Sequence, residues 1–292
     1  MIYMFLAAAF GITQDTCVKN YALKFEKFKG SNYLFYGIGA FITCICRAII
    51  DPVIILPIPI LLLLVLQSGL GVIVGRLLLK AMSNGPIAGI NLVMQCLSYI
   101  TVVYGIVLYG DEVSFLSVSA AIIFLIVLWL LSPPKENKNN THGKWFFCAI
   151  IAGIMAALAA CTQKTISEIG NDEYMEATVF WGALLSLIIY FVAFFATRPY
   201  KQKEFISCFV EEKKSAAKAI LLYGICGGFT GFMQLKALST ISSLIVYPTL
   251  WGLSVIITPI ISWIYYHDFK PTFRNITAII LGLFATILNV FA

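Results

Sequence analysis

The sequence predicts an all-α integral membrane protein with ten transmembrane helices, arranged as a five-plus-five inverted-topology repeat. Three observations lead to this fold class. The composition is too apolar to cover a soluble globule, because 60% of the residues are hydrophobic and only 12% are charged. The chain contains ten apolar runs long enough to cross a bilayer. Finally, a stretch of the first half recurs in the second half, 156 residues later.

The ten apolar runs divide evenly between two halves of the chain. The expected helices of the first half cover 2 to 22, 33 to 50, 59 to 80, 86 to 109 and 114 to 132. Those of the second half cover 145 to 165, 176 to 197, 218 to 238, 242 to 266 and 272 to 292. We therefore expect a first repeat at 1–132, a cytoplasmic connecting loop at 133–144 and a second, inverted repeat at 145–292. Since each half holds an odd number of helices, the two copies must enter the membrane in opposite directions.

The recurring stretch reads GVIVGRLLLKAMS at 71–83 and GGFTGFMQLKALS at 227–239. Both copies carry glycine at the first and fifth positions and end in Leu-Lys-Ala-x-Ser, and the same offset later pairs Glu112 with Asp268. A gap-free register of this length indicates an internal repeat. The two GxxxG patterns predict close helix packing within the chain rather than between chains, at Gly71, Gly75, Gly227 and Gly231.

Charge gives an independent prediction of orientation. Fifteen of the twenty basic residues fall in loops that follow the odd-numbered expected helices. The positive-inside rule places these loops in the cytoplasm and both termini outside a cell (plasma) membrane. The net charge of +6 thus bears on orientation and gives no reason to expect a nucleic-acid partner. Eight cysteines with no CxxC and only two histidines predict neither a metal site nor a disulfide framework.

The ends of the third and eighth expected helices, KAMS and KALS, resemble the drug/metabolite transporter superfamily, specifically its ten-helix EamA-type branch. The acidic turns GDEVS at 110–114 and HDFKPT at 267–272 add to the resemblance, although Asp268 stands where the family usually has Glu. The resemblance implies a secondary active transporter working by alternating access. Its expected cargo is a small amphipathic metabolite such as an amino acid, exported from the cell, with a sugar or nucleotide-sugar porter or exchanger as the alternative.

The expected substrate site lies near the membrane midplane, where polar groups are costly. Asn91 and Gln95 are one turn apart on one helix face, and their repeat mates are Tyr247 and Trp251. Two amides opposite two aromatic rings would suit a small, amphipathic, partly planar solute. The alternative is that the amides bond neighbouring helices and the aromatic rings only pack. Three further residues are expected to line the cavity: Gln14, Gln163 and Tyr223.

Coupling to a proton or cation gradient is expected to depend on Asp15, with Lys19 four residues away. A carboxylate at membrane depth can exchange a proton during a transport cycle, whereas a permanent Asp15–Lys19 pair would make both residues structural. The sequence carries no HExxH, no GxSxG and no nucleotide-binding loop, so we expect neither an enzyme nor catalytic residues. We expect no cofactor; the expected partners are the solute, the bilayer and a proton or cation, and the expected state is a monomer.

The acidic residues of the two turns have two possible roles. Glu112 and Asp268 each lie just before a helix, where a carboxylate is favourable at the positive helix end. We therefore expect them to cap those helices. The alternative is that they latch gates on opposite faces of the membrane.

Overall fold

The computed structural model describes residues 2–50, 55–110, 114–131, 141–169, 172–238, 254, 257–268 and 272–291. These residues are helical apart from short turns. The helices of the first half are α1 (Ile2–Phe25), α2 (Ser31–Ile50), α3 (Ile58–Asn84), α4 (Ile87–Tyr109) and α5 (Phe115–Leu131). Those of the second half are α6 (Thr141–Ile169), α7 (Asp172–Thr197), η1 (Pro199–Lys201), α8 (Lys203–Glu211), α9 (Lys213–Leu238), the π-helical turn η2 (Ser262–Tyr266) and α11 (Phe273–Val290).

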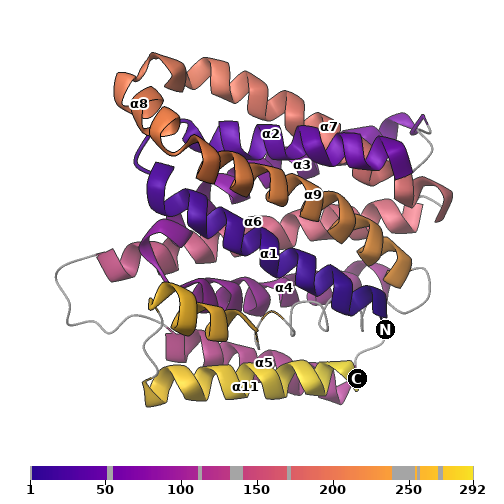
Figure 1. Ribbon diagram of the computed structural model, residues 1–292. Helices are drawn as coiled ribbons and strands as arrows, with labels where there is room; N and C mark the ends of the chain where they lie inside the picture. Colours follow the sequence, from indigo (N-terminus) through magenta and orange to yellow (C-terminus); the bar gives the residue numbers. More distant parts are fainter. Residues whose placement is uncertain are drawn as a thin grey trace.

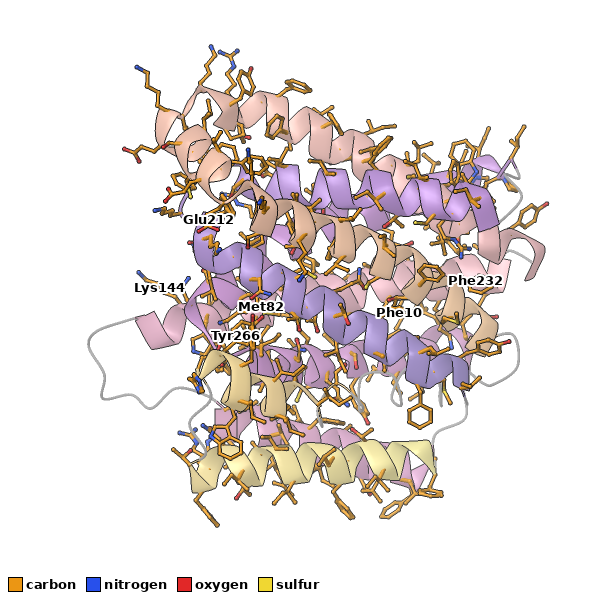
Figure 2. The ribbon with its side chains drawn as sticks, in the orientation of Figure 1. Phe10, Met82, Lys144, Glu212, Phe232 and Tyr266 are labelled. Carbon is orange, nitrogen blue, oxygen red and sulfur yellow. The ribbon has the colours of Figure 1, made fainter. Side chains whose placement is uncertain are left out.

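Most helices lie side by side, so the molecule has two ends (Figure 1). The short helix α8 lies at one end, which we call the basic end, and both chain termini lie near the other (Figure 1). Figure 2 places Lys144, Glu212, Met82 and Tyr266 toward the basic end, and Phe10 and Phe232 toward the opposite end. A helix with residues placed at these ends therefore has a known direction: α1, for example, runs from Phe10 toward the basic end.

Six helical segments in the described ranges are long and apolar enough to cross a membrane. They are Ser31–Ile49, Ile58–Asn84, Ile87–Tyr109, Gly143–Ile166, Ala177–Lys201 and Lys213–Met233. The protein is therefore a multi-pass membrane protein. Large apolar side chains on the outer faces of these helices agree with contact to lipid, for example Val107, which is 72% exposed. Helix α1, which carries Asp15 and Lys19, also has the length to cross, since its 24 residues extend about 36 Å.

The helices pack in pairs that join the two halves of the chain. Helix α1 packs against α9, and α3 packs against α6. Helix α2 lies against both α7 and α9, and α3 also contacts α7. Helices α5 and α11 form a further pair at one edge of the bundle (Figure 1). The buried core therefore depends on contacts between the halves rather than on two separate units.

The helix boundaries agree closely with those expected from the apolar runs. The main addition is η1 and α8, which lie between the seventh and eighth expected helices. The expected helix at 242–266 falls largely outside the described residues, and its described end is the π-helical turn η2.

Glycine packing differs in position from the expectation. A Cβ at Gly224 would lie 2.8 Å from the Gly39 carbonyl oxygen, so the close backbone approach between α2 and α9 is there. Gly71 has nothing within 4 Å of such a Cβ, while Gly75 and Gly227 face side chains and Gly231 faces Val179. Internal packing by glycine is thus present, but this close approach to a backbone atom lies at Gly224, which the repeat did not single out.

Candidate functional site

Helix α1 carries the polar residues of the candidate site between α9, α3 and α4. Lys19 and Asp15 are four residues apart, so Asp15 lies about 6 Å further from the basic end along the helix axis. The two side chains have different partners. The pairing of Asp15 with Lys19 that the spacing made possible is not formed.

Asp15 is partly buried and accepts a hydrogen bond from Asn91 of α4, with Asn91 Nδ2 2.8 Å from Asp15 Oδ2. Asn91 is only 4% exposed. The structure thus brings together the expected coupling carboxylate and an expected cavity residue. Within the described residues, the ion pairs are those of Lys19 and Lys24, and neither involves Asp15. Asp15 therefore presents a carboxylate held by a neutral amide.

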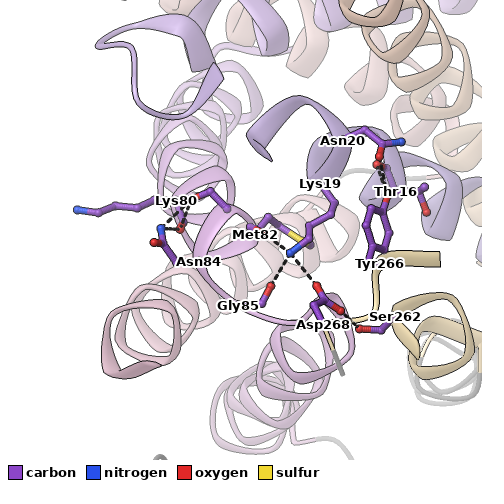
Figure 3. Close-up of polar contacts among 11 residues, drawn as sticks. Thr16, Lys19, Asn20, Lys80, Met82, Asn84, Gly85, Ser262, Tyr266 and Asp268 are labelled. Carbon is purple, nitrogen blue, oxygen red and sulfur yellow. Dashed lines mark hydrogen bonds and ion pairs between the residues drawn. The ribbon is translucent and has the colours of Figure 1, made fainter. Parts of the chain in front are cut away.

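Lys19 is 3% exposed and is bound by acceptors from two other parts of the chain. Its Nζ lies 2.8 Å from Asp268 Oδ2, and it donates hydrogen bonds to the carbonyl oxygens of Met82 at 2.6 Å and Gly85 at 2.7 Å (Figure 3). The two carbonyl contacts are hydrogen bonds from the ammonium, and the contact with Asp268 Oδ2 is an ion pair. Two of the acceptors are carbonyls at the end of α3, where a helix favours a cation. We call this arrangement the basic-end latch: Lys19, Asp268 and the two carbonyls.

The segment that ends at Asp268 is also attached to α1 by a tyrosine. Tyr266 Oη lies 3.0 Å from Asn20 Oδ1 and 3.2 Å from the Thr16 carbonyl oxygen, and its ring centroid is 5.7 Å from Lys19 Nζ. The Ser262 hydroxyl donates to the second carboxylate oxygen of Asp268 (Figure 3). Both oxygens of Asp268 are therefore used, and η2 is fixed against one face of α1.

The expected capping role of Asp268 is wrong. Thr272 is the N-cap of α11, because its hydroxyl oxygen accepts from the Asn275 amide at 3.3 Å. With that position filled by threonine, Asp268 pairs with Lys19. Glu112 lies outside the described residues.

A glycine without room for a side chain positions one latch carbonyl. A Cβ on Gly85 would lie 2.4 Å from Trp145 Cγ of α6, and Gly89 meets the same indole ring. The backbone φ of Gly85 is −139°, which any residue adopts, so the requirement for glycine is one of space. Trp145, packed into this turn, therefore holds the Gly85 carbonyl toward Lys19.

The other expected site residues are more scattered. Gln14 lies between α1 and α9, with its Nε2 3.4 Å from the Tyr223 carbonyl oxygen and its Oε1 3.4 Å from Thr230 Oγ1. Two expected candidates, Gln14 and Tyr223, are thus brought together, and the Tyr223 ring packs against Tyr36 at 5.4 Å. Gln163 is partly buried on α6. Tyr247 and Trp251 lie outside the described residues.

Gln95 faces α11 instead of Asp15. Its Nε2 donates to Thr286 Oγ1 at 2.9 Å, and both residues are buried. Its Oε1 is buried without a hydrogen-bond partner in the part of the chain that the structure describes. The Nε2 group therefore connects α4 to α11, whereas Oε1 stays an unused acceptor among the described residues.

Sequence reasoning missed Met82, Gly85 and Tyr266. The backbone carbonyls leave no side-chain signal, but the end of α3 at the Gly85–Pro86 turn is visible in the sequence. All eight cysteines are free thiols. No cluster of three or more His, Cys, Asp or Glu that could hold a metal occurs among the described residues.

No family model matches this chain, and no curated protein sequence matches it either. Twenty-six chains of solved structures are similar to it. One of them, described only as the crystal structure of a protein, has a TM-score of 0.63 and 12% sequence identity. The similarity covers 99% of this chain and 96% of that one, so the fold extends over the full length of both.

Proposed function

We propose that the protein is a ten-helix secondary active transporter of the EamA type that exports a small amphipathic metabolite bearing an amino group, such as an amino acid. It works by alternating access in the plasma membrane, and it is not an enzyme. The observation that carries this proposal is the Asp15–Asn91 pair, a carboxylate inside the helix bundle with a neutral partner.

The pattern of helix pairs supports the inverted repeat. Exchanging the halves replaces α1, α2, α3 and α5 by α6, α7, α9 and α11. This exchange turns the α1–α9 pair into the α6–α3 pair and the α2–α9 pair into the α7–α3 pair, all of which are present. The α2–α7 and α5–α11 pairs map onto themselves. A repeat with this internal two-fold relation supports a substrate site between the halves.

The polar groups near Asp15 favour a cationic or hydrogen-bond-donating solute. Asp15 offers carboxylate oxygens, one of which already accepts from the Asn91 amide. An ammonium group would find acceptors here, and the surrounding helices supply apolar surface. The same carboxylate can take up a proton when the solute leaves, which couples the two movements.

The basic-end latch supports a state that is closed at one end. Lys19 connects α1 to the end of α3 and to the segment before α11, so opening this end requires those three elements to separate. The abundance of basic loops at this end supports its placement in the cytoplasm and that of both termini outside.

Purified protein in liposomes tests the proposal by counterflow. Vesicles preloaded with one unlabelled solute would be assayed for uptake of the labelled form, across amino acids, amines, sugars and nucleotide sugars, with and without a pH gradient. Counterflow of an amino-bearing solute, accelerated by the gradient, is the expected result. Counterflow of sugars or nucleotide sugars alone contradicts the proposed substrate, and no counterflow of any solute contradicts transport.

A further inference from the structure

A cavity of about 440 Å³ opens at the basic end, away from Asp15. Its walls are the turn between α1 and α2, one face of α3 and Thr197 at the end of α7. The turn is fixed in place, because Gly30 has φ +87° and a Cβ there would lie 2.4 Å from Thr197 Oγ1. The cavity is therefore a preformed feature of the fold.

The charge of this cavity is positive. Lys29, Arg76 and Lys80 line it, against the single carboxylate of Glu26. None of the three basic side chains belongs to an ion pair in the described ranges. Three cations around one cavity favour an anionic ligand. A planar guanidinium together with ammonium groups is suited to binding phosphate.

A buried amide adds a second, independent feature. Asn32 lines the same cavity and is 7% exposed, yet its Nδ2 donor has no hydrogen-bond partner within the described part of the chain. It lies in the first turn of α2, a helix of 20 residues whose N-terminus favours an anion. A buried donor normally has an acceptor, so an anion in the cavity would satisfy it.

The apolar part of the lining indicates what carries the anion. Ile73 is 47% exposed and precedes Arg76 by three residues on the same face of α3, on the side away from the basic end. In a membrane helix, such a side chain contacts lipid tails. A molecule with its anion at Arg76 and Lys80 would place an attached hydrocarbon chain along Ile73.

We propose that this cavity binds the phosphate headgroup of an anionic phospholipid, with one acyl chain on the Ile73 face of α3. Lys29, Arg76 and Lys80 bind the phosphate oxygens, and Asn32 Nδ2 donates to one of them. A soluble phosphate uses the cations but gains nothing from Ile73, so the apolar wall favours the lipid. This inference does not depend on transport.

The test compares delipidated protein in neutral detergent with three probes: phosphatidylglycerol, phosphatidylcholine with the same acyl chains, and inorganic phosphate. Phosphatidylglycerol is expected to bind most tightly, as measured by direct titration and by retained lipid in native mass spectrometry. The R76Q/K80Q variant should bind it about thirtyfold more weakly at low ionic strength. Asn32→Leu should weaken binding about fivefold.

The matched control is K213Q/K214Q, which removes two exposed basic residues at the start of α9, outside the cavity. Its affinity for phosphatidylglycerol should change by less than about twofold, because the two charges lie away from the ligand. Equal binding of the two lipids, equal weakening by the control, or inorganic phosphate binding as tightly as phosphatidylglycerol overturns the proposal. Should R76Q/K80Q fail to elute as folded protein, the single variants at these exposed positions carry the same comparison.

Discussion

Asp15 and Lys19 are neighbours on α1, yet each has a partner from a distant part of the chain. The i, i+4 spacing allows a local pair, but such pairs contribute little compared with contacts that satisfy buried groups. Lys19 gains a carboxylate and two helix-end carbonyls, and Asp15 gains an amide. The buried ammonium thus has three partners other than Asp15, and the Asp15 carboxylate has a neutral one.

Asp15→Asn is expected to abolish pH-driven accumulation while retaining counterflow exchange, in which the solute alone completes the cycle. A proton gradient can drive transport only if the two conformations of the carrier bind a proton with different affinities. Both activities would be measured in the same liposome preparation. An Asn variant that still concentrates solute down an imposed proton gradient would place the coupling group elsewhere.

Lys19→Met is expected to lower the free energy of unfolding by about 3 kcal/mol, because it leaves Asp268 and two carbonyls without their donor. Thermal unfolding in detergent measures this change. Lys24→Met is the matched control, since the Lys24–Glu212 pair lies on the surface, with about a third of each side chain exposed, and costs about 1 kcal/mol or less. Equal effects of the two substitutions would contradict the latch.

At the scale of the residue, the sequence singled out polar side chains within the apolar helices but not the residues that contact them. Polar groups in apolar helices are conspicuous, and Asp15, Asn91 and Lys19 were identified on that basis. Their partners depend on packing between helices. Asp268 is 249 positions after Lys19 (268 minus 19), and its assignment as a cap followed a local rule that Thr272 satisfies instead.

Helix α3 helps to form the basic-end latch through its main chain, without contributing a side chain to it. Its last turn presents the Met82 carbonyl, and the following Gly85 fits beneath Trp145. The element ends where it does because Gly85 and Pro86 interrupt the helical pattern. Apolar runs are easily recognised in the sequence, which is why the boundaries of most helices were predicted closely, although the expected end of this helix at 80 falls short of Asn84. Helix α8, with nine residues, is too short to form an apolar run that could be recognised in the same way.

Gly85→Ala is expected to destabilise the protein by about 2 kcal/mol, because its Cβ must displace the indole of Trp145. Gly71→Ala is the matched control: its Cβ meets nothing within 4 Å, so the substitution should be neutral or stabilise helix α3 by up to about 1 kcal/mol. Unfolding temperatures of both variants in the same detergent provide the measurement. A larger loss at Gly71 than at Gly85 would contradict the packing described for this turn.

Across the whole molecule, the two halves are interleaved rather than joined end to end. Each of α1, α2 and α3 finds a main partner in the second half of the chain. A separate first half would expose the surfaces that these partners cover. The sequence repeat indicated two related units, but the register alone could not show that their helices alternate in space.

Single cysteines at Lys201 and Glu168, introduced after the eight native cysteines are replaced, are expected to label from opposite sides of the membrane. Lys201 lies in η1 near the basic end, and Glu168 lies at the far end of α6. The position at 201 should be protected from an impermeant reagent in intact cells and that at 168 should react. Equal reaction at both positions from outside would exclude the proposed orientation.

Two of the three partners of Lys19 are main-chain atoms, which no substitution can remove. This limits which second-site substitutions can compensate for the loss of Lys19. In a selection for regained expression from Lys19→Met, the intragenic suppressors that remove the orphaned charge itself must change Asp268, to Asn or an apolar residue. Substitutions at Met82 or Gly85 would leave their carbonyls in place. The spectrum of revertants should therefore be narrow and centred on a codon far from the original lesion.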